Sequence, residues 1–379
     1  MISKILIYEV HYSNFNRYVI PLSKYFVENE VSEKVVMVYD SFVEKEKIKK
    51  NLNKKITNRN ISKVYKELKK KDNNSDIIFI NYSYRIPDLY WTYKLKKIGV
   101  RCYQQQHGMY AEFLERSFLG YFSAINRKIT YFKYLFYFLL KLKASVFLYL
   151  INKDFVKSEN VNNLISEKFK KKIELIQSDH IFVWGDYWKK WFMKNHFYKS
   201  VDQFTTIGNP DYHVFIKNRV QNVEKDKVCY IAQTFVEDGR MDRVDYKKII
   251  DKISETFKEQ LLIKLHPRSD KTIFESVINN GGELLYDFPI TGYYIGHYSS
   301  LLALAINEDA NVFLLEINNE KIPHYFLNSA NKVFYNIEEL CHTIIRKDRL
   351  ESSQEISYFF ENKETHPFEI ITNFLINII

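Results

Sequence analysis

Two short polar stretches in the second half of the chain carry residue types suited to holding a phosphate. His266–Arg268 follows the apolar run 261–265, which predicts a strand that Pro267 ends because proline lacks the N–H that a ladder needs. Ser299–Ser300 precedes an apolar helical run, and a serine-capped helix start offers hydroxyl and free N–H groups to an anion. Singly, these stretches could be an ordinary turn and an ordinary helix cap. Together they predict a phosphate site at the carboxyl ends of strands, where open α/β sheets bind ligands.

A third candidate lies in the first half, where His107 and Gly108 follow the strand-like run 100–105. Glu112 and Glu115 lie just beyond them. A histidine near carboxylates is typical of a general base or of the group that orients one. A core histidine before a tight turn would give the same pattern, so both interpretations stay open.

Alternating strands and helices must position these residues. The pattern predicts parallel sheets covered by helices on both faces, and therefore an α/β protein. We expect two doubly wound, Rossmann-like domains, residues 1–216 and 227–379, facing each other across a cleft. Gly208, Asn209 and Pro210 form the best candidate hinge. The expected strands of the first half lie at 4–8, 34–39, 76–81, 100–105 and 180–185, with a final strand that starts at Thr205 and is followed by a turn. Those of the second half lie at 227–232, 261–265, 283–286, 292–296 and 312–317.

The composition of the chain indicates which classes of binding partner it favours. The 379 residues carry a formal net charge of +10, which favours anionic partners such as nucleotides, acidic glycans or anionic lipid. Basic residues are spread over many helices without an RNA-binding signature, so nucleic acid is not an expected partner. Three widely spaced cysteines form neither a disulfide framework nor a metal motif, which favours a cytoplasmic location.

The segment 116–150 differs from the rest of the chain. It holds six Lys or Arg, eleven Phe or Tyr and no carboxylate. Its uncharged runs are far shorter than the roughly 20 residues that a spanning helix needs. The segment is expected to be either a buried helical hairpin or an interfacial element that meets the inner face of the cytoplasmic membrane.

The motifs together resemble inverting GT-B glycosyltransferases of bacterial surface polysaccharides. The likeness rests on the His-Pro pair at 266–267, the Ser pair at 299–300 and the stretch Gln233–Gly239 with its Glu237-Asp238-Gly239 triplet. It is strongest to bacterial sialyltransferases and polysialyltransferases. This resemblance implies a CMP-sugar donor held by these residues and a glycan or lipid-linked oligosaccharide acceptor from capsule or lipooligosaccharide synthesis. No metal or cofactor is expected, because protein donors could carry the phosphate charge and the second half contains no Asp-x-Asp pair.

One departure changes the expected catalytic base. The family's acidic triplet is missing before residue 200, and Gln106-His107-Gly108 stands in that half instead. This sequence resembles teichoic-acid type glycerophosphotransferases, which implies CDP-glycerol as an alternative donor. We expect His107, Glu112 or Glu115 to take the acceptor proton. A hypothesis from another class is a non-catalytic, polyanion-binding protein, whose binding would depend steeply on salt.

Overall fold

The computed structural model forms two compact units, each of which is described by itself. Unit 1 contains residues 1–107, 124–208 and 363–379, and unit 2 contains residues 108–123 and 209–362. The structure describes residues 2–10, 15–40, 54–108, 125–152, 167–217, 224–297, 299–307, 310–317, 322–327, 330, 332–346, 359–361 and 363–378.

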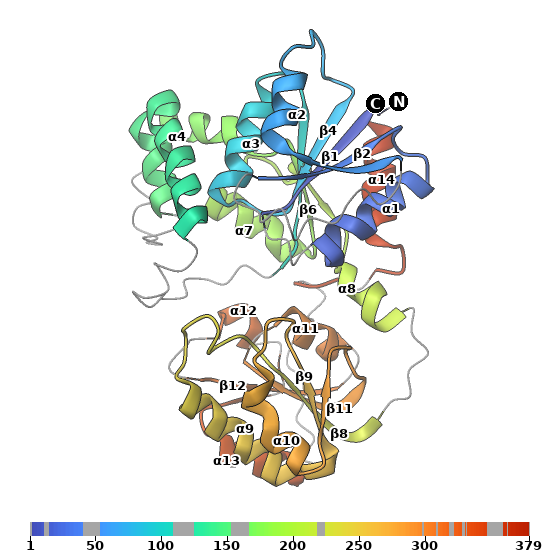
Figure 1. Cartoon of the computed structure of the whole chain (residues 1–379), viewed down its shortest axis with the longest axis vertical. Coiled ribbons are helices and arrows are strands. Elements are labelled where there is room, and N and C mark those ends of the chain that lie inside the picture. Colours follow the sequence, from blue (N-terminus) through green and yellow to red (C-terminus); the bar gives the residue numbers. More distant parts are fainter. Residues whose placement is uncertain are drawn as a thin grey trace. The chain divides into compact units, whose positions relative to one another are not determined.

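Unit 1 is built on a seven-stranded parallel sheet (Figure 1). The strand order is 3-2-1-4-5-6-7, so the order reverses between β1 and β4. This is the doubly wound Rossmann arrangement with one added strand. In sheet order the strands are β3 (Ile56–Asn60), β2 (Val35–Tyr39), β1 (Lys4–Tyr8), β4 (Ile77–Asn81), β5 (Arg101–Gln105), β6 (His180–Val183) and β7 (Phe204–Thr206).

Helices cover both faces of this sheet because the strands are apolar on both sides. Ile5 and Ile7 of β1 pack in the core that contains α1 and α14, whereas Leu6 and Tyr8 pack in the core that contains α2 and α3. The helices are η2 (Phe15–Val19), α1 (Ile20–Glu28), α2 (Ile61–Leu68), α3 (Ile86–Lys96), α4 (Ile125–Ile151), α6 (Glu167–Ile173), η6 (Glu174–Ile176), α7 (Asp186–His196), η7 (Val201–Gln203) and α14 (Pro367–Asn377).

Unit 2 contains a six-stranded parallel sheet whose order, numbered along this unit, is again 3-2-1-4-5-6. The order reverses between β8 and β11, which are direct neighbours. In sheet order the strands are β10 (Glu283–Leu285), β9 (Leu261–Lys264), β8 (Glu224–Ile231), β11 (Thr291–Gly296), β12 (Asn311–Leu315) and β13 (Lys332–Phe334).

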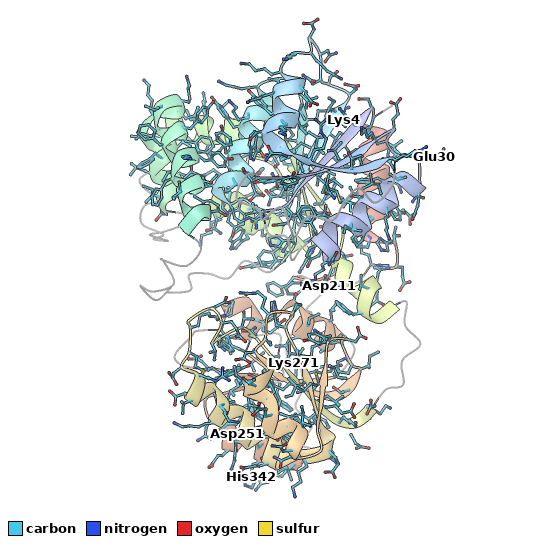
Figure 2. The ribbon with its side chains drawn as sticks, in the orientation of Figure 1. Lys4, Glu30, Asp211, Asp251, Lys271 and His342 are labelled. Carbon is cyan, nitrogen blue, oxygen red and sulfur yellow. The ribbon has the colours of Figure 1, made fainter. Side chains whose placement is uncertain are left out.

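One face of this second sheet is covered by α9, α10 and α13, which share a core with Tyr230 and Ile263. Lys271 and His342 are exposed on this unit (Figure 2). Its helices are α8 (Pro210–Tyr212), η8 (His213–Lys217), α9 (Arg243–Phe257), η9 (Lys258–Gln260), η10 (Lys271–Phe274), α10 (Glu275–Asn279), α11 (Ser300–Asn307), α12 (His324–Leu327) and α13 (Ile337–Ile345).

The α/β fold with two Rossmann-like sheets is confirmed, and three details differ from the expectation. The polar strand β3 and the short strand β13 were not expected from the sequence. The C-terminal helix α14 packs with α1 in unit 1, although the sequence had grouped it with the second half. The part of segment 116–150 that the structure describes is α4, which has one buried side and one exposed side.

Candidate functional site

The carboxyl edge of the unit 1 sheet gathers polar side chains from neighbouring strands. Glu9 follows β1, Tyr82 follows β4 and His107 lies just beyond β5. Because β1, β4 and β5 are adjacent, and because the strand order reverses between β1 and β4, these residues lie where doubly wound sheets bind ligands.

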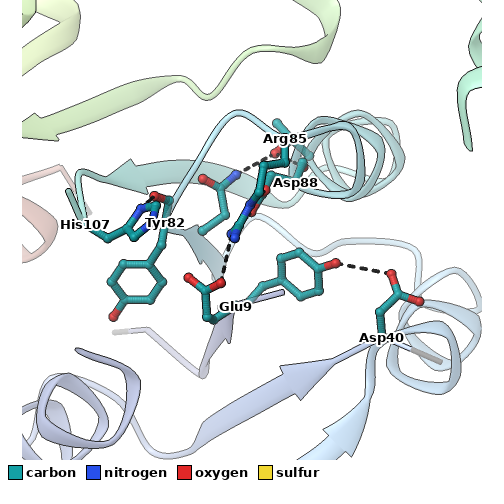
Figure 3. Close-up of polar contacts among 9 residues, drawn as sticks. Glu9, Asp40, Tyr82, Arg85, Asp88 and His107 are labelled. Carbon is teal, nitrogen blue, oxygen red and sulfur yellow. Dashed lines mark hydrogen bonds and ion pairs between the residues drawn. The ribbon is translucent and has the colours of Figure 1, made fainter. Parts of the chain in front are cut away.

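A buried ion cluster lies at this edge (Figure 3). Arg85, at the start of α3, contacts the carboxylate of Glu9 at 2.9 Å and that of Asp88 at 2.8 Å. Both carboxylates are fully buried. Burial acts against the guanidinium charge, but the two carboxylates outweigh it and raise the pKa of Arg85 well above its usual value. Ion pairs with two carboxylates hold the Arg85 guanidinium in one position at this edge of the sheet.

His107 is held in one orientation by the backbone. Its Nδ1 lies 2.5 Å from the carbonyl oxygen of Tyr82, so Nδ1 carries the hydrogen and Nε2 has the lone pair (Figure 3). Burial lowers the pKa of His107; the Glu9 carboxylate opposes this shift, and the Arg85 guanidinium adds to it. The imidazole is therefore neutral near pH 7 and can accept a proton at Nε2.

The other two candidate bases, Glu112 and Glu115, lie outside the described residues. Sequence reasoning missed Glu9, Arg85 and Asp88. A signal for Glu9 was available, because it is a carboxylate directly after the buried run 5–8. No comparable signal marked Arg85 and Asp88, whose partner Glu9 is more than seventy positions away in the sequence.

In unit 2 the candidate phosphate residues follow three adjacent strands. Thr234 and Asp238 come after β8, His266 and Arg268 after β9, and the serine pair after β11. The sheet places β9, β8 and β11 side by side. The structure thus brings the sequence-predicted residues of the second half to one edge, at the point where the strand order reverses.

Arg268 links two of these loops. Its guanidinium donates to the Asp238 carboxylate at 2.8 Å and to the Thr234 hydroxyl at 3.0 Å. Thr234 in turn donates to Asp238 at 2.7 Å. Burial raises the pKa of Asp238, but the hydrogen bonds from Arg268 and Thr234 outweigh it and lower that pKa overall. Arg268 is thus held by a carboxylate at the edge where it was expected to meet a phosphate.

His266 has the opposite tautomer from His107. Its Nδ1 accepts a hydrogen bond of 3.1 Å from the backbone N–H of Arg268, so the hydrogen of the neutral ring is on Nε2. The Ser269 hydroxyl accepts from the His266 N–H at 3.2 Å. Pro267 is exposed at the tip of this turn. A neutral ring that donates from Nε2 is suited to a phosphate oxygen, whereas it cannot act as a base there.

The serine pair begins α11. The Ser299 hydroxyl accepts from the Leu301 N–H at 3.2 Å and thereby caps the helix, which starts at Ser300. Gly296 lets this helix pack closely on β11, because a Cβ there would lie 2.7 Å from the Leu302 side chain. The neighbouring Tyr298 lies outside the described residues.

The stretch 233–239 forms a turn that positions Asp238. Gly239 ends it with a φ of +67°, which favours glycine. Glu237 accepts a 2.6 Å hydrogen bond from the backbone N–H of Asp270 and so ties this turn to the loop after β9. The carbonyl oxygen of Gln233 accepts from the Tyr246 hydroxyl at 3.5 Å. These two contacts stabilise the turn, and a direct role of Glu237 and Gln233 toward a nucleotide stays a prediction.

The expected hinge coincides with a boundary between the units, which falls between Gly208 and Asn209. Gly208 has a φ of +80°, and Asn209 caps α8, which begins at Pro210, through the Asp211 N–H at 3.0 Å. Motion at this point stays a prediction. Within the described ranges, no group of three or more His, Cys, Asp or Glu is placed to hold a metal ion.

Comparisons with known proteins identify the fold. No protein-family model matches the chain, and no curated protein matches it in sequence. Among solved structures, the wall teichoic acid polymerase TagF, determined with CDPG, superposes with a TM-score of 0.55 at 11% identity. That match covers 98% of this chain and 88% of TagF.

Two further solved structures match this chain over its whole length and over the whole of their own chains. Os79 from O. sativa, in complex with UDP, has a TM-score of 0.53 at 8% identity. UDP-GlcNAc 2-epimerase from Methanocaldococcus jannaschii, in complex with UDP-GlcNAc and UDP, has a TM-score of 0.52 at 12% identity. At such identities the likeness shows the fold alone, and that fold is GT-B.

Proposed function

We propose that this chain is a glycosyltransferase-type enzyme that transfers sialic acid or a related sugar from a CMP-activated donor. The observation that carries the proposal is the edge of unit 2, where the Thr234–Asp238–Arg268 network, His266 and the Ser299 cap follow three adjacent strands. A helix start at the reversal point of a Rossmann sheet is suited to a nucleotide phosphate. The likeness of the His-Pro and Ser-Ser motifs to sialyltransferases supports cytidine as the base.

In the proposed reaction the acceptor hydroxyl attacks the anomeric carbon, and the bond from that carbon to the CMP phosphate oxygen breaks with inversion. His266 donates from Nε2 to the leaving phosphate, and the hydroxyl and N–H groups at the start of α11 add further donors. These protein donors would carry the phosphate charge without a metal or a cofactor.

His107 takes the acceptor proton in this proposal. Its Nδ1 is fixed on the Tyr82 carbonyl, and its lowered pKa keeps Nε2 unprotonated near neutral pH. Among the three expected bases it is the one whose geometry the structure describes. The proposal requires the carboxyl edges of both units to act on one substrate.

A second candidate is transfer of a polyol phosphate from a CDP-glycerol-type donor. His107 at the end of β5 favours it, because Gln106-His107-Gly108 resembles the motif of glycerophosphotransferases, and TagF shares the fold. In that case the acceptor oxygen attacks the β-phosphorus and CMP leaves. The same edge of unit 2 would then bind the phosphate of the leaving CMP.

The proposed setting is bacterial capsule or lipooligosaccharide synthesis at the inner face of the cytoplasmic membrane, with a glycan or lipid-linked oligosaccharide as acceptor. No helix in the described residues is long and apolar enough to cross a bilayer. The membrane contact in this proposal is peripheral.

The test is a donor panel with EDTA present, using CMP-sialic acid, CDP-glycerol and UDP-N-acetylglucosamine with an oligosaccharide acceptor, read by product mass. Transfer from CMP-sialic acid is expected, and transfer from CDP-glycerol alone selects the second candidate. Strict metal dependence or a preference for the UDP donor contradicts both. Thermal shifts separate an enzyme from a polyanion-binding protein, because CMP at 100 times its Kd should stabilise an enzyme by about 2.7 kcal/mol.

A further inference from the structure

Helix α4 presents an unusual row of apolar side chains to solvent. Ile129, Phe132, Phe136 and Leu140 are between 48% and 66% exposed, and their spacing of three and four residues places them on one face. Leu148 is 54% exposed on the same element. These five are one third of the fifteen large hydrophobic residues that are exposed in the described part of the chain.

The helix is a hairpin of two arms with an apolar groove. Its backbone reverses at Lys143, which has a φ of +67° and a ψ of −176°. A groove of about 400 Å³ lies against the two arms, and its lining is entirely apolar: Phe132, Leu135, Phe136, Leu139, Phe147 and Ile151. We call the exposed row and this groove together the hairpin face.

The other side of α4 is firmly attached to unit 1, beside α3 (Figure 1). Tyr134 donates to the buried Asp40 carboxylate at 2.8 Å and stacks on Tyr90 with ring centroids 3.9 Å apart. Phe138 and Leu142 are buried in a core with Leu89 of α3. The hairpin face is therefore displayed by an anchored element, and it is not the exposed side of a loosely packed one.

The charges around the hairpin face select its partner. No Asp or Glu occurs between Ile125 and Ile151, and Lys133, Lys141 and Lys143 are exposed. Two copies joined through this face would bring these cations together, which disfavours self-association. Aromatic and aliphatic side chains bordered by lysines fit an anionic lipid surface.

We infer that the hairpin face docks on an anionic bilayer, with α4 lying in the interface and a lipid hydrocarbon chain entering the groove. The inference deepens the membrane location attached to the proposed function and names the element responsible. It needs no transferase chemistry, so each can fail without the other.

The experiment is flotation of the full chain with phosphatidylcholine vesicles, with and without phosphatidylglycerol. Binding should require phosphatidylglycerol and weaken with salt. Phe132→Asp with Phe136→Asp should abolish it, whereas Val244→Asp, at an exposed apolar position of unit 2, should leave it intact. Lys133→Gln with Lys141→Gln should weaken binding by up to about fivefold per lysine, unlike the control pair Lys63→Gln with Lys69→Gln.

The groove is tested with Phe136→Trp, which lipids brominated on the acyl chain should quench more strongly than they quench the wild type. Failure of the wild type to float, or flotation unchanged in the double Asp variant, overturns the inference. So does a protein dimer that the double Asp variant dissociates in the absence of lipid binding. The thermal unfolding temperature of each variant without ligand shows whether the fold is intact, and stabilisation by CMP reports separately on the proposed function.

Discussion

Acid should destabilise unit 1 through one buried histidine. His180 begins β6 and is 7% exposed; its ring stacks on Phe374 of α14 at 4.2 Å, and its Nε2 lies 2.9 Å from the Thr205 hydroxyl. Burial, with a smaller contribution from Lys189, lowers the pKa of His180 from 6.5 to about 4. In the folded protein the His180 imidazole is therefore neutral, and its protonation is unfavourable.

The direction and the magnitude of this loss of folding stability follow from the difference between the pKa values of His180 in the folded and unfolded states. Well above pH 6.5 the ring is neutral in both the folded and the unfolded state, so no stability is lost there. Between pH 6.5 and about 4 the unfolded chain binds a proton that the folded chain does not, so stability falls as the pH falls. A shift of one pKa unit is 1.36 kcal/mol, so the full loss is about 3 kcal/mol, of which about 2.5 kcal/mol has appeared by pH 4.5.

All four tryptophans of the chain, Trp91, Trp184, Trp188 and Trp191, belong to unit 1, so their fluorescence reports on its unfolding alone. Urea unfolding at pH 7.0 and 4.5 should show a larger loss of stability for the wild type than for His180→Phe, by about 2.5 kcal/mol. The comparison isolates His180 because other groups titrate alike in both proteins. Parallel losses in the two proteins would refute the reasoning.

Three further predictions concern the sheet edges and the strands behind them. His266→Ala should lose about 2–4 kcal/mol of transition-state stabilisation, measured from kcat/KM, while the fold stays intact. The control His366→Ala, at the other His-Pro pair, should leave kcat/KM near normal. Equal effects of the two substitutions would exclude a phosphate-binding role for His266. His107→Gln should lower the rate by about 10²–10⁴-fold and abolish an acid limb that lies below pH 6.5 in the wild type; an unchanged pH–rate profile would exclude this base. Gly292→Ala should destabilise unit 2 by about 1–3 kcal/mol, because the added Cβ would lie 2.1 Å from the Lys225 carbonyl oxygen. Calorimetry measures this loss, and an unchanged Tm would contradict the close approach of Gly292 to Lys225.

Most of the two sheets could be predicted because their central strands are apolar on both faces. Ile77–Asn81 and Leu261–Lys264 are uniformly buried, and such runs between helical patterns indicate parallel strands. β3, with the sequence Ile-Thr-Asn-Arg-Asn, could not be recognised in this way because it is an edge strand whose backbone pairs with β2 while its side chains stay polar. The place of α14 was equally hidden, since an amphipathic pattern shows that a helix has a buried side but not which sheet it covers.

The candidate site was predictable at strand ends and not elsewhere. His107, His266 and the serine pair were found because strand periodicity shows where a strand stops. The Glu9–Arg85–Asp88 cluster depends on β1 and β4 being neighbours, and that adjacency is a property of the strand order. Pairing of charges across a sheet edge therefore needs the topology before it can be inferred.

The two His-Pro pairs show what a motif can and cannot establish. His366 accepts a 3.1 Å hydrogen bond at Nδ1 from the Phe368 N–H, the same contact that His266 makes with the Arg268 N–H. The local turn is therefore common to both pairs and carries no functional information. What separates them is position, because His366 caps α14 whereas His266 lies at the carboxyl end of β9, next to the turn after β8. The shared turn also fixes the hydrogen of a neutral His266 on Nε2, while the Tyr82 carbonyl fixes that of His107 on Nδ1. In the proposed reaction, His266 would therefore donate a hydrogen bond to the phosphate and His107 would accept the proton of the acceptor hydroxyl.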